Sequence, residues 1–235
     1  MQAPLHTVAQ RNKKFEKIYG QSGDEIIDNE SYDNVDFSVK ICFLPLLTQS
    51  TAKELAYAVI DWLATRQDGY YEYRDTYNDG YFTKASLTNF NEIVRELPTL
   101  LTATLKFNRM PFWYRDDGLI ATTFNVGGTD NTLINPEPYD SEPVYQFWQG
   151  ALGGVNVTII VNGIAVSEVL PVEVETAYYD NVQKQLYRVS NGAKIYISST
   201  MLPNLQPGTN VIRFSRNGVG TGSFNLKVIP NWRRL

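Results

Sequence analysis

The stretch that decides the fold runs from residue 34 to residue 44 and reads NVDFSVKICFL. Four of its apolar side chains alternate with polar ones: Val35, Phe37, Val39 and Ile41. A period of two places alternate side chains on opposite faces of a strand, so the pattern predicts a strand with one buried and one wetted face. Pro45 follows at once and ends this strand.

One helix is predicted after this strand. Thr51, with Glu54 three residues later, has the form of a capping box, and the helix is expected to extend to about residue 66. Its apolar positions fall on one helical face: Leu55, Val59, Trp62 and Leu63. This stripe is expected to cover a face of a sheet, and the Asp-Gly pair at 68–69 ends the helix.

Strands are predicted on the C-terminal side of the helix as well. They cover residues 70–74, residues 81–90 after the turn sequence NDG at 78–80, and the alternating stretch 100–110. The first thirty residues are polar and contain glycines, so we expect a mobile lead-in with turns there.

The second half of the chain shows turn signals between short strands and no helical period. Strands are predicted at 155–161, 177–179, 185–189, 193–198, 209–215 and 223–229. The acidic, glycine-bearing stretch 115–118 is interpreted as the joint between two domains, 1–117 and 118–235. The predicted fold is mostly β, with an α+β N-terminal domain of a sheet and one helix followed by an all-β sandwich.

Composition excludes several classes of function. Of 235 residues 43% are hydrophobic and the net charge is -4, which argues against a sequence-specific nucleic-acid binder. No apolar stretch of about 18 residues occurs, so we expect folding in a cytoplasm without membrane insertion. The single cysteine, Cys42, cannot form an internal disulfide or a cysteine-based metal site, and it is expected to be buried.

The sequence offers little for catalysis. Its one histidine, His6, lies in the polar lead-in, so a Ser-His-Asp or Cys-His arrangement is not expected. The carboxylates fall in turns or on alternating strand faces, although a pair from distant segments, as in a wall hydrolase, stays open. We therefore predict a protein that is not an enzyme and that has no catalytic residues, no cofactor and no metal.

Several segments, taken in order, resemble the siphophage distal tail protein (Dit) family. They are GQSGD at 20–24, YDNVDFSV at 32–39, FNRMPF at 107–112, LPNLQPGTN at 202–210 and PNWRRL at 230–235. Family members open with a further apolar strand or hairpin before the glycine-bearing turn, whereas here nineteen residues of polar character precede Gly20.

The resemblance implies a structural protein at the distal end of a phage tail, assembled in the cytoplasm of the bacterial host. Six copies of the N-terminal domain are expected to form one ring, or two stacked rings, through which DNA passes. The implied partners are the tail tube protein, a tape-measure or baseplate hub protein, and receptor-binding or adsorption proteins. The C-terminal sandwich is expected to have a galectin-like or carbohydrate-module-like architecture.

The candidate residues form two groups. Ring contacts are expected at Val35, Phe37, Val39, Ile41, Phe107, Pro111, Phe112 and Trp113. Each of these also fits an ordinary place in the core. The alternative function is an accessory protein that recognises host cell-surface saccharide, with stacking expected at Trp148, Tyr178, Tyr179, Tyr187 and Trp232.

Overall fold

A computed structural model describes the chain in ten segments. They are residues 7–43, 51–65, 68–97, 100–125, 129–148, 155–170, 176–190, 192–198, 202–217 and 225–235. The chain divides after Trp113 into two compact units, close to the predicted joint at 115–118, and Leu235 groups with the first unit. Within the described residues no helix is long and apolar enough to span a membrane.

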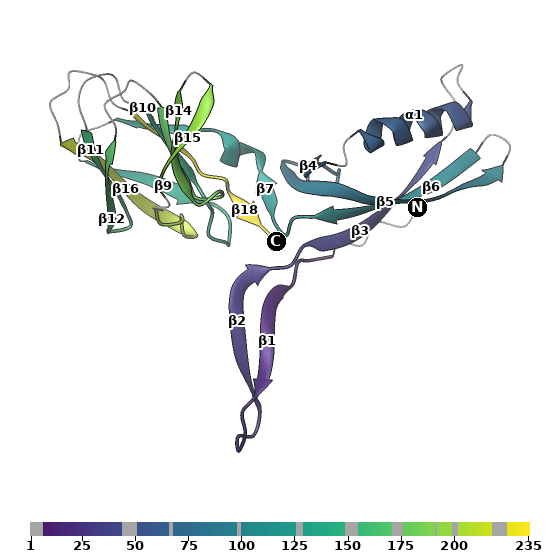
Figure 1. Cartoon of the computed structure of the whole chain (residues 1–235), viewed down its shortest axis with the longest axis horizontal. Helices are drawn as coiled ribbons and strands as arrows, with labels where there is room; N and C mark the ends of the chain where they lie inside the picture. Colours follow the sequence, from purple (N-terminus) through teal and green to yellow (C-terminus); the bar gives the residue numbers. More distant parts are fainter. Residues whose placement is uncertain are drawn as a thin grey trace. The chain divides into compact units, whose positions relative to one another are not determined.

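The first unit contains an antiparallel sheet with one helix. In the sheet β6 (Leu100–Arg109) lies between β5 (Tyr81–Leu97) and β3 (Val35–Phe43), and β4 (Tyr71–Tyr73) pairs with β5. The register of β3 and β6 runs from Val35 opposite Arg109 to Phe43 opposite Leu101. Figure 1 shows the helix α1 (Ala52–Ala64) along one face of this sheet.

The helix confirms the sequence prediction in its start and in part of its stripe. Thr51 and Glu54 form the capping box, and Leu55 and Val59 pack against a small buried cluster on the sheet. Trp62, which was expected on the buried stripe, is exposed. Cys42 on β3 is also exposed, so the expectation of a buried thiol is wrong.

The first thirty residues, predicted as a mobile lead-in with turns, contain strands instead. Residues 11–32 form a β-hairpin of β1 (Arg11–Lys17) and β2 (Asp24–Tyr32), drawn in purple in Figure 1. The turn between the strands contains Gly20 and Gly23, both with positive φ, a conformation that glycine adopts at little cost. A strand therefore does precede the glycine-bearing turn. Because nearly all residues of this strand are polar, its sequence shows no alternation of apolar and polar residues. His6 lies outside the described residues.

The second unit is an all-β sandwich, as the sequence predicts. One sheet has the order β15-β14-β13-β10-β17-β8 and the other β12-β11-β16-β9. Their bounds are β8 (Thr122–Asn125), β9 (Asp130–Asn135), β10 (Val144–Trp148), β11 (Val155–Val161), β12 (Ile164–Leu170), β13 (Thr176–Asp180), β14 (Gln185–Ser190), β15 (Ala193–Ser198), β16 (Gly208–Asn217) and β17 (Asn225–Ile229). Strands β8, β9, β10 and β12 have no counterpart in the sequence prediction.

Side chains from both sheets of the sandwich share one core. Among the largest fully buried ones are Tyr145, Tyr179 and Leu186 from the first sheet and Ile159 and Phe214 from the second. These positions alternate with outward-facing residues, so burial of one face of each sheet is what holds the layers together. The galectin-like detail of the architecture stays a prediction.

The last residues of the chain form backbone hydrogen bonds with the segment 115–118. The stretch 115–118 is not an open joint, because Asp116–Leu119 form a 3-10 helix between β7 (Trp113–Arg115) and β8. The amide of Arg115 donates to the carbonyl of Trp232 at 2.9 Å, and the amide of Asn231 donates to the carbonyl of Gly118 at 2.8 Å. The short strand β18 (Arg233–Arg234) follows directly.

Candidate assembly surfaces

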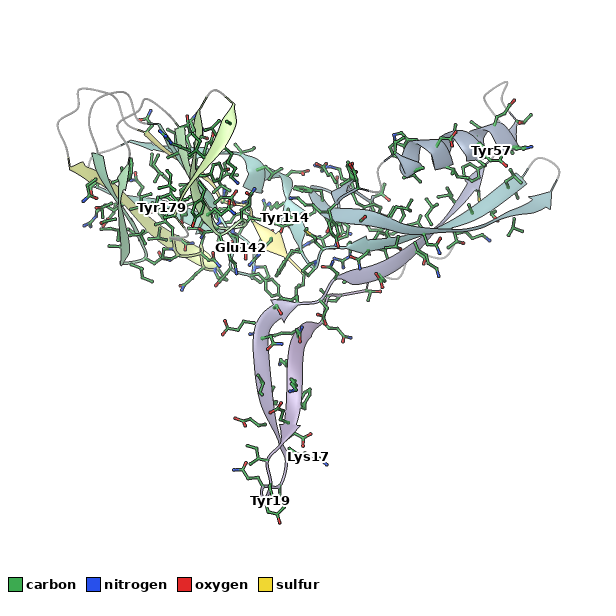
Figure 2. All side chains as sticks on the ribbon, in the orientation of Figure 1. Lys17, Tyr19, Tyr57, Tyr114, Glu142 and Tyr179 are labelled. Carbon is green, nitrogen blue, oxygen red and sulfur yellow. The ribbon has the colours of Figure 1, made fainter. Side chains whose placement is uncertain are left out.

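The hairpin of β1 and β2 is exposed along most of its length. Every residue of β2 except Tyr32 is exposed, and so are its large apolar side chains, with Phe15 61% and Ile26 57% accessible. Figure 2 shows the side chains along the hairpin, with Lys17 and Tyr19 labelled near its tip. A two-stranded sheet that covers no core is marginal in water, so this hairpin needs another surface to hold its shape.

The root of the hairpin is fixed to the rest of the unit by a buried arginine. The guanidinium of Arg109 donates to the carbonyl of Thr7 at 2.6 Å and to the carbonyls of Met110 and Pro111 at 3.0 and 3.1 Å. Burial lowers the pKa of Arg109 below its usual value, but three carbonyl acceptors surround the charge. These bonds anchor the root of the hairpin to the rest of the first unit.

The two strands of the hairpin carry opposite charge. Strand β1 has four basic side chains and one acidic one, a net charge of +3, whereas β2 has four acidic side chains and no basic one. Arg11 and Asp28 form an ion pair at 2.6 Å across the strands. The hydrogen bond from Arg11 is the largest cause that holds the pKa of Asp28 below its usual 3.8.

Strand β3 gives the first unit a second open edge. It is the last strand of its sheet, and no strand pairs with its outer side in the part of the chain that is described. An unpaired edge presents a row of N–H and C=O groups that a further strand can bind. The nine residues of β3 make this edge longer than a typical strand of five or six residues.

The structure gives most of the predicted ring-contact residues an intramolecular partner. Val35 and Trp113 are buried, and Phe37 stacks on Phe107 at 5.3 Å between ring centroids. Phe112 meets Tyr32 edge to face at 5.4 Å, which ties it to the root of the hairpin. Pro111 is half-buried and accepts a hydrogen bond from Arg109 through its carbonyl. Their contact with another copy therefore stays a prediction.

Val39 and Ile41 are half-buried and line a cavity of about 720 Å³ between α1 and the sheet. Val59 and Trp62 of the helix and Leu105 and Phe107 of β6 also line it. The lining is almost entirely apolar, so the helix covers this face of the sheet incompletely.

The predicted saccharide-stacking residues divide into buried and half-buried ones. Tyr179 and Trp232 are 1% and 5% exposed, so neither can offer a ring face to a sugar. Tyr178 and Tyr187 stack on each other at 5.1 Å, and the ammonium of Lys194 lies 3.8 Å from the centre of the Tyr187 ring. These contacts occupy ring faces that a sugar would need. Trp148 lies in β10, but its side chain is outside the described residues.

The sequence matches no protein-family model and no curated protein. The structure, however, superimposes on the Dit protein of phage SPP1 with a TM-score of 0.66, over 94% of this chain and 88% of that one. The two sequences are 12% identical. The chain has the Dit fold. The SPP1 protein is described as a paradigm of the hub adsorption apparatus of phages that infect Gram-positive bacteria. A baseplate structure of phage P2 matches more weakly, with a TM-score of 0.47 at 8% identity, over 96% of this chain and 88% of that one.

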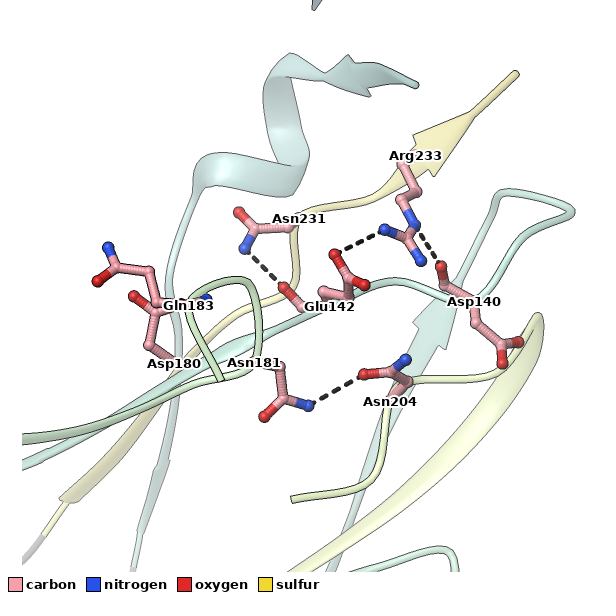
Figure 3. A network of polar contacts seen from close by, with 8 residues as sticks. All are labelled: Asp140, Glu142, Asp180, Asn181, Gln183, Asn204, Asn231 and Arg233. Carbon is pink, nitrogen blue, oxygen red and sulfur yellow. Dashed lines mark hydrogen bonds and ion pairs between the residues drawn. The ribbon is translucent and has the colours of Figure 1, made fainter. Parts of the chain in front are cut away.

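Two of the segments that carry the resemblance to Dit proteins, 202–210 and 230–235, make polar contacts within the second unit. Arg233 donates to Glu142 at 2.7 Å and to the carbonyl of Asp140 at 2.6 Å, as Figure 3 shows. Asn181 donates to Asn204 at 3.1 Å. Asn204 lies in 202–210 and Arg233 in 230–235, so a polar residue of each segment has a structural role.

Within the described ranges, no group of three or more His, Cys, Asp or Glu side chains could hold a metal ion. In the network of Figure 3 the carboxylate of Glu142 pairs with Arg233, and the carboxylate of Asp180 accepts a hydrogen bond from the backbone amide of Gln183. Both contacts fix loops. That the protein has no catalytic activity stays a prediction.

The hairpin of β1 and β2, an exposed surface of this fold, was not predicted from the sequence. A signal was present, because the basic run RNKKFEK at 11–17 and the acidic run at 24–30 flank two glycines. Oppositely charged segments on either side of a turn favour a hairpin through their cross-strand pairs.

Proposed function

We propose that this protein is a structural subunit of a phage virion, a hub at the distal end of the tail. In this function six copies form a ring that links the tail tube to the baseplate or receptor-binding apparatus and lets DNA pass. The observation that carries the proposal is the likeness to SPP1 Dit, because it extends over both units in chain order.

The open edges of the first unit support assembly into a ring. A ring of identical subunits needs two different surfaces on each copy, since each contact is heterologous. In the described part of the first unit, the two edges of the exposed hairpin and the outer edge of β3 are such surfaces. Pairing at these edges requires no change of fold in the subunit, because no strand of the described chain occupies them.

The partners follow from the same function. The tail tube protein would contact one side of the ring, and a tape-measure or baseplate hub protein the other, as one ring or two stacked rings. Receptor-binding or adsorption proteins would attach to this hub. The net charge of -4 suits a channel for DNA, because a basic lining would hold the polyanion.

The test is the mass of the purified full chain in solution, measured by native mass spectrometry and by light scattering over a range of concentrations. A ring of six 26.7-kDa chains has a mass of about 160 kDa, and a double ring twice that. Negative-stain micrographs should show annular particles of that mass. A monomer at the highest concentration, with no annular particles, would overturn the proposal.

A further inference from the structure

The inference concerns the two free edges of the hairpin. In the described chain β1 pairs only with β2 and β2 only with β1, so each strand keeps one unpaired edge. Natural proteins protect long exposed edges or use them for pairing. The side chains on these two edges have opposite net charge, +3 on β1 and -4 on β2.

We propose that the hairpins of neighbouring copies pair edge to edge, with β1 of one copy against β2 of the next. The partner is thus a second copy of this chain, and the inference rests on the proposed ring. Repeated around six copies, this contact would close twelve strands into one continuous antiparallel sheet.

Charge decides which edges meet. A twofold contact would place β1 against β1 or β2 against β2, and each of these brings like charges together. A rotation around a ring places the basic β1 of one copy against the acidic β2 of the next, and these opposite charges attract each other. It also keeps all hairpins pointing the same way, so β1 of one copy runs antiparallel to β2 of the next, as it does inside each hairpin.

Pairing within one hairpin does not use all of these charges. Lys17 lies opposite Asp24 and Lys13 opposite Asp28, which are favourable pairs. Glu16, however, lies opposite Glu25, a like-charge pair that costs stability. A basic β1 from a neighbouring copy would supply Glu25 with the opposite charge that its own hairpin does not place across from it.

Apolar side chains add a second gain. Phe15 and Ile26 are direct cross-strand partners on one face of the hairpin, and both are more than half exposed. In the extended sheet each such pair would lie beside the pair of the next copy. Aromatic and β-branched neighbours of this kind stabilise a sheet, so the contact would reduce the exposure that the lone hairpin shows.

Two charge-reversal variants of the full chain test the inference. The first carries Lys13→Glu, Lys14→Glu and Lys17→Glu, which changes the net charge of β1 from +3 to -3. The second carries Asp24→Lys, Glu25→Lys and Asp28→Lys, which changes that of β2 from -4 to +2. The control carries the same number of reversals at exposed lysines outside the hairpin: Lys53→Glu, Lys184→Glu and Lys227→Glu.

Each hairpin variant alone should need about a tenfold higher concentration, or more, to form half of its rings, because its β1 and β2 have the same sign. The control should assemble as the unmodified chain does. An equal mixture of the two variants should again form rings, in which the variants alternate, since each β1 then meets a β2 of opposite sign. Native mass spectrometry identifies such rings by their mixed mass.

The mixture separates contact between copies from damage within one copy. Like charges inside each variant hairpin persist in the mixture, and only the pairing between copies is restored there. Rings that fail to return would therefore mean that opposite charge on β1 and β2 of neighbouring copies does not drive assembly, and would overturn the inference. Rings of both single variants at the unmodified concentration would overturn it too, while leaving the proposed hub intact. Absence of rings from the unmodified chain would instead overturn the proposed function and this inference together.

Discussion

Replacing Arg109 with methionine should loosen the root of the hairpin. The side chain is buried, and its guanidinium donates three hydrogen bonds, to the carbonyls of Thr7, Met110 and Pro111 at 2.6 to 3.1 Å. Methionine keeps much of the apolar stem but none of the donors. The ring of Trp113 also loses a cation, whose centre lies 5.5 Å away.

The magnitude follows from the bonds lost. A net value of about 0.5–1.5 kcal/mol for each hydrogen bond gives a loss of about 2–4 kcal/mol in the free energy of unfolding of the first unit. The free energy of unfolding of Arg109→Lys should lie between those of the unmodified protein and Arg109→Met. An ammonium keeps the charge but lacks the planar fork that reaches several carbonyls.

Urea unfolding gives the free energy, and hydrogen exchange with mass spectrometry locates the change. Peptides that contain residues 7–17 should exchange faster, because the bond to Thr7 joins the hairpin root to β6. Lys106→Met is the matched control, since Lys106 is exposed on the same strand. If Arg109→Met and Lys106→Met differ by less than about 0.5 kcal/mol, the anchoring role assigned to Arg109 is refuted.

Three further changes test other parts of the structure. Gly118→Ala should destabilise the second unit by about 1–3 kcal/mol in thermal unfolding, because the new Cβ would lie 2.6 Å from the backbone nitrogen of Trp232. Tyr145→Phe should cost about 1 kcal/mol, and the phenol of Tyr145 should stay protonated when exposed tyrosines ionise, since burial raises its pKa. The carboxyl of Asp28 should titrate below pH 3.8 by NMR, and Arg11→Gln should move its midpoint back up.

Each of these has an outcome that contradicts it. Gly69→Ala is the control for Gly118→Ala, because a Cβ at Gly69 would have no other atom within 4 Å. Equal stability of the two variants would show that the close approach of Gly118 to Trp232 does not matter for stability. Ionisation of Tyr145 near pH 10 would mean that its site is open to water. The lowered pKa of Asp28 means that its ion pair supports the hairpin above pH 3.8 and is lost as the pH falls through the folded pKa. An unchanged midpoint in Arg11→Gln would show that Arg11 is not the cause.

Much of the architecture could be predicted from local patterns. The alternation in 34–44, the capping box at Thr51 and Glu54, and the Asn162-Gly163 turn with positive φ at both residues all depend on near neighbours in the chain. Strand faces, helix starts and tight turns are set by backbone geometry and by hydration of nearby side chains. These features were therefore readable without the fold.

The candidate surfaces were harder to predict, because exposure depends on what else packs nearby. Tyr178 and Tyr179 are neighbours in sequence, yet Tyr179 enters the core and Tyr178 stacks on the outer face. Phe37 and Phe107 are seventy residues apart in the sequence, yet they lie opposite each other on β3 and β6 and their rings stack. A period of two separates the faces of a strand but does not say which face another layer covers.

The sequence by itself determined a mostly β chain with one helix, its turns, and a second half without helices. Only the tertiary structure decided that residues 11–32 leave the core as a hairpin with two open edges, and that β3 ends its sheet. The physical reason is range: strand and helix propensity act over a few residues, whereas an unpaired edge exists only relative to strands distant in the chain.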